Sequence, residues 1–186
     1  MKAILINLIY IYDRYLRHRF RVLYGEAYLK YFNDVDVSVK LHGKMTIWSK
    51  NNIKIGKYTR IGQNFFADAR GVILIGENVQ ISRNVIIYSS NHNYDTGQAI
   101  PYDNKVKIKK VTIGDSVWIG MNSIILPGVT IGKGAIIGIG AIIYKDVPAY
   151  TVVVNSSMKF LKMRDKESFN KMENDKMFFG KLYPND

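Results

Sequence analysis

The sequence of 186 residues contains no cysteine and only three histidines, His18, His42 and His92. Without cysteine there is no disulfide framework, no thiolate metal site and no thiol nucleophile, and the composition fits a reducing cytoplasm. The histidines are too scattered to supply a three-histidine zinc site, so we expect no metal. The apolar run from Ala3 to Tyr12 is too short to span a bilayer.

Acidic residues are also scarce relative to basic ones. Lys and Arg number 27 and Asp and Glu 15, which gives a net charge of +12. Such a surplus favours anionic partners: nucleic acid, an anionic membrane surface or a phosphorylated cofactor. No zinc-finger, basic-zipper or nucleic-acid-binding aromatic-sheet motif is visible, so we expect no nucleic-acid partner. The charge is therefore assigned to a phosphate-bearing ligand and to lipid headgroups.

The stretch from Val111 to Pro148 has a strict six-residue period. Isoleucine recurs at every sixth position, and a small or β-branched residue follows each isoleucine four places later. The isoleucines are Ile113, Ile119, Ile125, Ile131, Ile137 and Ile143, and the second set is Val117, Ser123, Val129, Ala135, Ala141 and Val147. A hexapeptide period is the mark of a parallel β-helix, in which three units of one strand and one corner close a coil. We therefore predict a mainly β protein with the isoleucines pointing inward.

The repeat extends toward the N-terminus with two interruptions. Residues Ile53–Ile61 show the same arrangement, but eight residues separate Ala67 from Ile75. Two extra residues are therefore expected to loop out around Ala69–Val72. The pattern resumes as far as Ile87 and stops again from Ser89 to Lys110. Such a turn-rich, lysine-rich excursion from a solenoid is usually a functional loop.

Residues 1–46 are expected to form a helix, from Met1 to about Phe32, and a transition into the coil. The helix has one apolar face, formed by Leu5, Leu8, Ile9, Tyr12, Leu16, Phe20, Leu23 and Ala27. Two interpretations are open: this face packs on the β-helix or a neighbouring subunit, or the basic helix makes a peripheral contact with the inner membrane face. The β-helix, with its excursion loop at about 90–110, occupies 47–154. A polar tail, whose composition also suits a helix, occupies 155–186.

The segments VTIGDSVWIG and ILPGVTIGKGAIIGIGAIIYKDVP resemble the left-handed β-helix acyltransferases of the maltose, galactoside and capsular-sugar O-acetyltransferase type. The resemblance covers roughly Ile53 to Lys162. It implies acetyl-coenzyme A as acyl donor and a sugar hydroxyl as acceptor, in a surface polysaccharide or its precursor. It also implies a homotrimer with the site between two subunits. Left-handedness comes from the resemblance alone, since parallel β crossovers are usually right-handed.

His92 lies where the excursion leaves the regular coil, and in this family a histidine just before the loop is the general base. By resemblance, His92 takes the proton of the acceptor hydroxyl as the oxygen attacks the thioester carbonyl directly. The group that orients the other ring nitrogen is left open between a loop carbonyl and Asp95. Ser89 or Ser90 as nucleophile has no support in the pattern. Trp118 faces outward by the repeat and matches a family tryptophan near the catalytic histidine, the alternative being a subunit contact.

The resemblance also implies contacts for acetyl-coenzyme A. They are backbone groups near Met121 and Ile139, one coil apart, then Tyr144 and Lys145, and finally Lys159 and Lys162 at the nucleotide phosphates. The family's Gly-Asn-Pro-Ala turn is replaced here by Asn-Ser-Ser-Met at 155–158, so the tail is expected to leave the coil differently. Some members use an early carboxylate or amide near the acceptor. Asp68 and Asn64 are the candidates in the irregular region.

Two alternatives stand beside O-acetyl transfer to a sugar. One is N-acetyl transfer to an amino sugar, on the same coil and with the same acyl donor. The other is a non-enzymatic β-helical scaffold or membrane-docking module, built on the basic helix and the lysine-rich loop. A β-helical carbonic anhydrase is excluded, because it needs three histidine ligands to zinc at a spacing that this chain does not offer.

Overall fold

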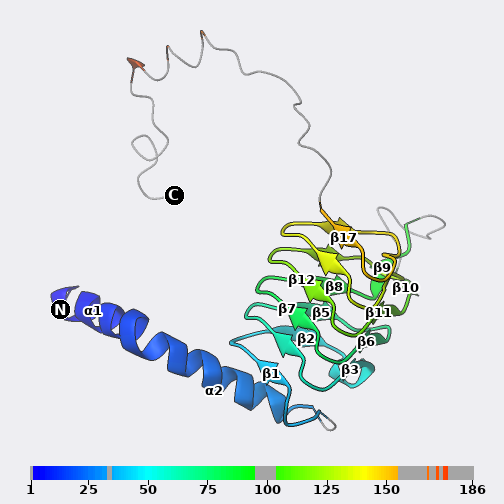
Figure 1. Ribbon diagram of the computed structural model, residues 1–186. Helices are drawn as coiled ribbons and strands as arrows, with labels where there is room; N and C mark the ends of the chain where they lie inside the picture. Colours follow the sequence, from blue (N-terminus) through cyan, green and yellow to red (C-terminus); the bar gives the residue numbers. More distant parts are fainter. Residues whose placement is uncertain are drawn as a thin grey trace. The chain divides into compact units, whose positions relative to one another are not determined.

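The computed structural model describes residues 2–32, 35–94 and 104–154, and beyond them only Glu167, Lys171, Asn174 and Asp175. Short parallel strands follow one another around three sheets and stack coil upon coil (Figure 1). The chain from Lys40 to Val153 is therefore the parallel β-helix that the six-residue period predicts.

Each side of the coil is one parallel sheet. Sheet 1 contains β1 (Lys40–Leu41), β4 (Arg60–Ile61), β7 (Gln80–Ile81), β12 (Trp118–Ile119), β15 (Ile136–Ile137) and β17 (Val152–Val153). Sheet 2 contains β2 (Thr46–Trp48), β5 (Phe66–Asp68), β8 (Ile86–Tyr88), β13 (Ile124–Ile125) and β16 (Ile142–Ile143). Sheet 3 contains β3 (Ile53–Ile55), β6 (Ile73–Ile75), β11 (Val111–Ile113) and β14 (Thr130–Ile131). Ile113 pairs with Ile131, 18 residues further on, so three six-residue units make one coil.

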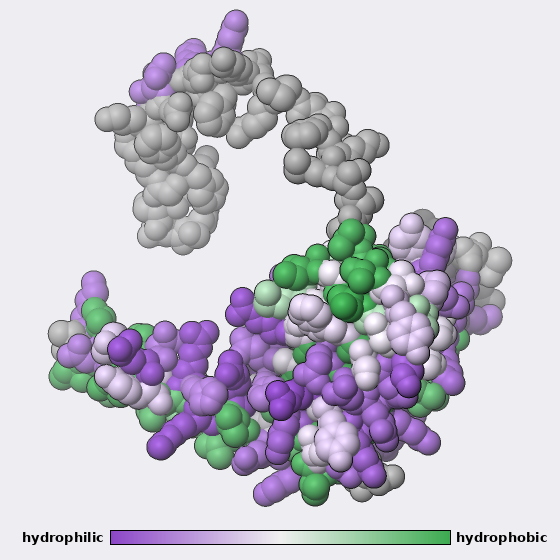
Figure 2. All heavy atoms as spheres, in the orientation of Figure 1, coloured by the Kyte–Doolittle hydropathy of each residue, from purple (hydrophilic) through white to green (hydrophobic). Residues whose placement is uncertain are grey.

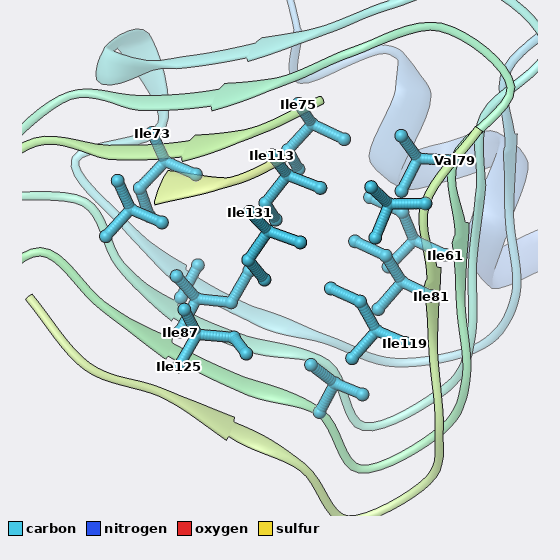
Figure 3. Packing of buried hydrophobic residues seen from close by; sticks show 14 of the residues in the cluster. Ile61, Ile73, Ile75, Val79, Ile81, Ile87, Ile113, Ile119, Ile125 and Ile131 are labelled. Atoms are coloured by element: carbon cyan, nitrogen blue, oxygen red, sulfur yellow. The ribbon is translucent and has the colours of Figure 1, made fainter. Parts of the chain in front are cut away.

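The side chains at the two repeat positions fill the inside of the coil. Ile125 has no exposed surface, and the second set, from Val117 to Val147, is buried as well. Figure 3 shows the inward side chains stacked between coils: Ile75, Ile113 and Ile131 on one side, and Ile61, Ile81 and Ile119 on another. Burying each isoleucine contributes about 1.5–3 kcal/mol. Both predicted sets of inward positions are confirmed.

The corners between sheets 1 and 2 use asparagine as well as glycine. Asn64, Asn84 and Asn122 occupy successive coils with φ of 57°, 59° and 60°. The side-chain amide of Asn64 donates to Oδ1 of Asn84 at 3.2 Å, and that of Asn84 donates to Oδ1 of Asn122 at 2.9 Å. Asparagine tolerates the left-handed conformation that these turns require, and the side-chain ladder ties one coil to the next.

The corner between sheets 2 and 3 is enlarged in three successive coils. A 3-10 turn over Lys50–Asn52 lies there in the first coil, residues 69–72 in the second, and the excursion at 89–110 in the third. Ile53 pairs with Ile73, 20 residues further on, which confirms the two-residue insertion expected in the second coil. Because the coils stack, the 3-10 turn, residues 69–72 and the described ends of the excursion lie above one another on one side of the coil.

The β-helix begins before the expected boundary at residue 47. β1 pairs with β4 and β2 with β5, so the first coil starts at Lys40. Its inward side chains include Val39, Leu41 and Met45. These residues continue the core without isoleucine, and a boundary placed on isoleucine spacing therefore came too late.

The N-terminal helix has three parts: α1 (Lys2–Ile11), a π-helical turn η1 (Tyr12–Leu16) and α2 (Arg17–Leu29). The described side chains of α1 are all exposed, whereas Tyr28 and Leu29 of α2 pack against the core. Backbones touch at Gly25, where a Cβ would lie 1.7 Å from the carbonyl oxygen of Leu41. Within one chain, the expected packing of an apolar face on the β-helix is therefore correct for the end of α2 and wrong for α1. No helix in the described ranges is long and apolar enough to cross a bilayer.

The last continuous described range ends at Val154, just after β17, and hydrophobic side chains gather at that end of the coil (Figure 2). Val152 and Val154 are 63% and 70% exposed there. The helix expected in the tail, Lys159 and Lys162 lie outside the described residues.

Candidate active site

The enlarged corner between sheets 2 and 3 forms a cleft of about 440 Å³. Its walls come from four coils, because the register stacks the last residues of β2, β5 and β8 and then Leu126 after β13. The lining residues are Trp48, Asp68, Arg70, Tyr88, Ser90, Asn91, His92, Leu126 and Pro127. The predicted base, His92, therefore lies in a cleft that the irregular segments of the repeat create.

A two-stranded hairpin carries His92 into this position. β9 (Ser90–His92) runs antiparallel to β10 (Val106–Ile108), and His92 pairs with Val106. The backbone amide of His92 donates to Oδ1 of Asn91 at 2.8 Å, and the residue is exposed. The imidazole is therefore held at the mouth of the cleft on a strand, accessible to a ligand. Asp95, one candidate to orient the ring, lies outside the described residues.

Asp68 is the buried carboxylate of the cleft, with 1% of its surface exposed. Arg70 donates to both carboxylate oxygens over 2.9–3.2 Å, and the hydroxyl of Ser90 donates to Oδ2 at 2.6 Å. Burial by itself raises the pKa of Asp68, but the hydrogen bonds from Arg70 and Ser90 outweigh it and hold the pKa below its usual value. Asp68 is therefore a carboxylate at neutral pH. Of the two early candidates, the fold brings Asp68 to the cleft and places Asn64 in a corner ladder.

Ser89, just before β9, is hydrogen-bonded to the neighbouring coil. Its buried hydroxyl donates to the carbonyl of Asp68 at 2.6 Å and accepts the amide hydrogen of Gly71 at 2.9 Å. A Cβ at Gly71 would lie 2.9 Å from the carbonyl oxygen of Ser89 and 2.7 Å from a methyl carbon of Ile108. Ser89 and Ser90 are thus buried, hydrogen-bonded parts of the support for His92.

Aromatic side chains line the outer face of sheet 2 beside the cleft. The rings of Trp48 and Phe66 meet edge to face with centroids 5.1 Å apart, and Phe66 and Tyr88 lie 5.4 Å apart. The guanidinium carbon of Arg70 stands 6.0 Å from the Trp48 ring centroid. Flat apolar faces next to charged groups suit the alternating C–H and hydroxyl surfaces of a sugar.

The residues expected to contact acetyl-coenzyme A divide between two corners. Met121 and Ile139 lie one coil apart at the corner between sheets 1 and 2, where the amide of Gly140 donates to the carbonyl of Met121 at 2.8 Å. Tyr144 and Lys145 lie at the corner between sheets 2 and 3, with the Lys145 ammonium 5.6 Å from the Tyr144 ring centroid. The two sets therefore occupy opposite ends of the same short strands in a single chain.

The corner at Met121 and Ile139 fits an extended amide-bearing arm. The side chain of Ile139 is 66% exposed, and its backbone N–H and C=O make no hydrogen bond within the described part of the chain. A Cβ at Gly140 would meet nothing within 4 Å, so the surface beside Ile139 is open. Exposed backbone groups along an open corner can pair with the amides of a pantetheine arm.

Trp118 lies in β12 of sheet 1, between Gln80 and Ile136, and is 53% exposed as predicted. It does not line the cleft that contains His92 in the same chain. Trp118 lies near the corner of Met121 rather than that of His92. Its function at an active site stays a prediction.

The described ranges contain no group of three His, Asp or Glu side chains that could hold a metal ion. The cleft instead offers one imidazole, one carboxylate–guanidinium pair and aromatic faces. These groups can bind a polyhydroxylated ligand and remove a proton from it.

A parallel β-helix of hexapeptide repeats is the fold of a class of transferases, and comparison with known proteins agrees. The bacterial transferase hexapeptide family (six repeats) matches residues 110–145. Galactoside O-acetyltransferase of Escherichia coli K12 is 33% identical over 62% of this chain and 61% of its own length. The dTDP-4-amino-4,6-dideoxy-D-glucose acyltransferase of Escherichia coli is 30% identical over 73% of this chain and 84% of its own length.

Among solved structures, the hexapeptide-repeat acetyltransferase VCA0836 of Vibrio cholerae in complex with acetyl-coenzyme A superposes with a TM-score of 0.58. It is 24% identical and covers 83% of this chain and 92% of its own, which supports the fold. The chain belongs to the hexapeptide-repeat acyltransferase family, and the expected left-handed parallel β-helix is confirmed. It spans between 56% and 61% of the length of galactoside O-acetyltransferase and of two putative acetyltransferases, from Saccharomyces cerevisiae and Schizosaccharomyces pombe.

Trp48, Arg70 and the supporting function of Ser89 and Ser90 were missed in the sequence. The hexapeptide period marks inward positions only, and these residues lie in the segments that break it. The one available signal was the insertion itself, because residues added to a solenoid corner stack beside the insertions of neighbouring coils.

Proposed function

We propose that this protein transfers an acetyl group from acetyl-coenzyme A to a hydroxyl of a sugar, in a surface polysaccharide or its precursor. The observation that carries the proposal is the position of His92, exposed on strand β9 at the mouth of a cleft lined by aromatic and charged side chains. Galactoside O-acetyltransferase, a relative of this chain, has a matching activity by its name. The cytoplasm is the compartment we assign, because a chain without cysteine fits a reducing environment.

His92 is the general base of the reaction. Its imidazole takes the proton from the acceptor hydroxyl while that oxygen attacks the thioester carbonyl, so a free alkoxide never forms. The carbon–sulfur bond then breaks, and the imidazolium returns the proton to the departing thiolate, which leaves as coenzyme A. Asp68 is an ionised carboxylate that accepts hydrogen bonds from Arg70 and Ser90. These three residues form the polar side of the cleft, which binds the sugar hydroxyls. Trp48 and Tyr88 offer faces to the pyranose ring.

The division of the expected contacts between two corners supports a homotrimer. In the proposed trimer, three copies associate around a three-fold axis parallel to their coils, and the corner of Met121 and Trp118 in one chain faces the corner of His92 in the next. Trp118→Ala should then raise the KM for acetyl-coenzyme A or for the sugar while sedimentation still shows a trimer. Loss of the trimer in this variant would assign Trp118 to subunit contact instead.

The N-terminal helix is proposed as the peripheral membrane contact. The described side chains of α1 include Ile4, Leu5 and Ile9, which are 66%, 60% and 59% exposed, and arginines follow directly. An exposed apolar helix next to cations is the arrangement that binds an anionic bilayer surface.

Replacement of His92 by Ala tests the proposed function. We expect kcat for acetyl transfer to fall by about 100- to 10,000-fold, with folding and association retained. His42→Gln, at a histidine outside the cleft, should keep wild-type kcat. Equal activity of His92→Ala and wild type would remove the proposed base.

The relative that acts on an amino sugar makes N-acetyl transfer the second candidate. The two products differ in stability, because an ester is cleaved in mild base and an amide survives. Mass spectrometry of candidate glycans incubated with the enzyme and acetyl-coenzyme A should show an added acetyl group that is lost in mild base. An alkali-stable product would assign N-acetyl transfer.

A further inference from the structure

A second cleft, of about 340 Å³, lies where the N-terminal helix meets the β-helix. We call it the guanidinium cleft; it is lined by Asp13, Arg14, Arg17, His18, Arg21, Gln63 and Arg83. The first five residues come from η1 and α2, and the last two come from the corner between sheets 1 and 2. The cleft is separate from the one that contains His92.

The positive charge of this cleft is largely uncompensated. Asp13 is its one carboxylate and pairs with Arg17 at 2.8 Å. Arg21 donates to Nδ1 of His18 at 3.0 Å, and its Nε is buried without a hydrogen-bond partner among the described residues. Nε of Arg83 contacts the sulfur of Met121 at 3.2 Å, a weak acceptor. Guanidinium groups with unfilled donors, one of them buried, favour an anionic ligand.

His42 lies close to the same basic residues, and its pKa is lowered. Burial lowers the pKa of His42, and the charges of Arg21, Arg60, His18 and Lys40 lower it further. All four of these neighbours are basic residues. The electrostatic potential at this junction is therefore positive on the side of the coil as well as on the helix.

Backbone hydrogen bonds place the guanidinium cleft in line with the corner proposed for acetyl-coenzyme A. The amide of Asn122 donates to the carbonyl of Arg83 at 3.3 Å, and the amide of Gly140 donates to that of Met121 at 2.8 Å. Arg83, Met121 and Ile139 thus occupy one corner in three successive coils, each about 4.8 Å from the next. The guanidinium cleft lies on the N-terminal side of Met121, whereas Lys159 and Lys162, expected at the nucleotide phosphates of coenzyme A, follow on the C-terminal side in sequence.

We propose that the guanidinium cleft binds the diphosphate of a phosphate-linked acceptor sugar, so that the sugar itself lies toward the thioester. This inference rests on the proposed function, which places the acyl donor along Met121 and Ile139. A diphosphate offers the several oxygens that two or more guanidinium groups bind in bidentate fashion. A nucleoside diphosphate sugar and a lipid-linked diphosphate sugar share this chemistry.

Calorimetric titration with inorganic pyrophosphate tests the site without any acyl transfer. Wild-type protein should bind pyrophosphate, and the double variant Arg14→Gln/Arg83→Gln should bind it at least about tenfold more weakly. Arg19→Gln removes an arginine of the same helix that does not line the cleft, and it should bind like wild type. Absence of binding to wild type, or equal loss in Arg19→Gln, would overturn the proposal.

Competition experiments identify the source of the diphosphate. Displacement of pyrophosphate by uridine diphosphate indicates a nucleotide-linked acceptor, and displacement by phosphatidylcholine vesicles doped with a polyprenyl diphosphate indicates a lipid-linked one. If neither displaces it, the cleft holds only an inorganic ion and the proposal fails. If coenzyme A displaces it with the same dependence on Arg14 and Arg83, the cleft belongs to the acyl donor and the proposal also fails.

The two proposals fail in different ways. His92→Ala should retain wild-type pyrophosphate binding, because His92 lies in the other cleft. Full acetyl transfer by His92→Ala, with pyrophosphate binding intact, would contradict the proposed base and leave the phosphate site standing. Loss of pyrophosphate binding in both His92→Ala and the arginine variant would contradict the separation of the two sites.

Discussion

The hydroxyl of Ser90 donates a 2.6 Å hydrogen bond to Oδ2 of Asp68, 22 positions earlier in the chain. This bond joins the first residue of the strand that carries His92 to the coil beneath it. Both partners are buried, and Arg70 completes the carboxylate's set of hydrogen bonds. The position of the proposed base is therefore fixed by polar contacts within the enlarged corner.

Ser90→Ala should weaken that support. The carboxylate of Asp68 would lose a charge-assisted hydrogen bond in a buried site, at a cost of about 1–3 kcal/mol. We expect kcat for acetyl transfer to fall by about tenfold and the KM for acetyl-coenzyme A to stay unchanged, since the acyl-donor corner lies elsewhere. Steady-state kinetics and urea denaturation measure the two effects. Ser82→Ala is the control, and an equal fall in its kcat would contradict a specific function of Ser90.

Asp68→Asn should change how stability depends on pH. The pKa of Asp68 is below its ordinary value of 3.8 in the folded protein, so its carboxylate stabilises the fold above that pH. This contribution is lost as the pH falls through the folded-state pKa. Melting temperatures measured from neutral pH to about pH 3 should show a large difference between wild type and variant at neutral pH and a smaller one in acid. Parallel curves would contradict the assigned ion pair.

Ile125→Ala should destabilise the β-helix strongly, because Ile125 is fully buried in the inward ladder. Removing a buried isoleucine side chain to alanine typically costs about 2–5 kcal/mol, including the cavity that remains. The matched control is Ile142→Ala, because Ile142 faces outward and is 50% exposed. Urea denaturation should separate the two variants clearly. Equal losses would contradict the assignment of inward and outward positions.

Gly25→Ala should detach α2 from the coil. A Cβ at Gly25 would lie 1.7 Å from the carbonyl oxygen of Leu41. That oxygen belongs to the backbone, so it cannot move aside as the end of a flexible side chain could. We expect amides of α2 to lose protection in hydrogen exchange while the coils from β11 to β16 keep theirs. Glu26→Ala, at the exposed neighbouring position, should leave protection unchanged. Retained protection of α2 in Gly25→Ala would show that the helix shifts to accommodate the methyl group.

Protonation of His42 tests the environment of the junction, because burial first and the charges of neighbouring basic residues second lower its pKa. Because the pKa of His42 is lowered in the folded state, the unfolded chain binds the proton more tightly, and stability should fall as the pH drops through about 6.5. His42→Gln should remove this part of the pH dependence between pH 7 and the folded-state pKa. Melting temperatures that fall equally in wild type and variant over this window would contradict the assignment.

The sequence predicted the regular part of the fold well. Every inward isoleucine from Ile113 to Ile143 is buried, Trp118 faces outward, and the insertion around Ala69–Val72 lies where the period breaks. The predicted position of His92 at the start of an excursion is also confirmed. These features follow from a six-residue period that can be counted along the chain, since three such units make one coil of 18 residues.

The first coil and the exposure of α1 were not predictable in the same way. Leu41 and Met45 continue the core with residues that carry no hexapeptide signature. The apolar stripe counted along α1 looks like a packing face, but a stripe does not specify what it packs against. The π-helical turn at Tyr12–Leu16 has no distinctive composition that would mark it.

By itself the sequence determined a coil of hexapeptide units and a histidine at its main interruption, because inward isoleucines at a fixed spacing can be buried only by stacking. Only the tertiary structure decided that Asp68, Arg70 and Ser90 meet beneath His92, and that arginines of η1 and α2 meet Arg83 of the coil. The physical reason is that these contacts join irregular segments. Which residues of these segments meet depends on the corner that each insertion enlarges, and the spacing of residues along the chain does not specify that corner.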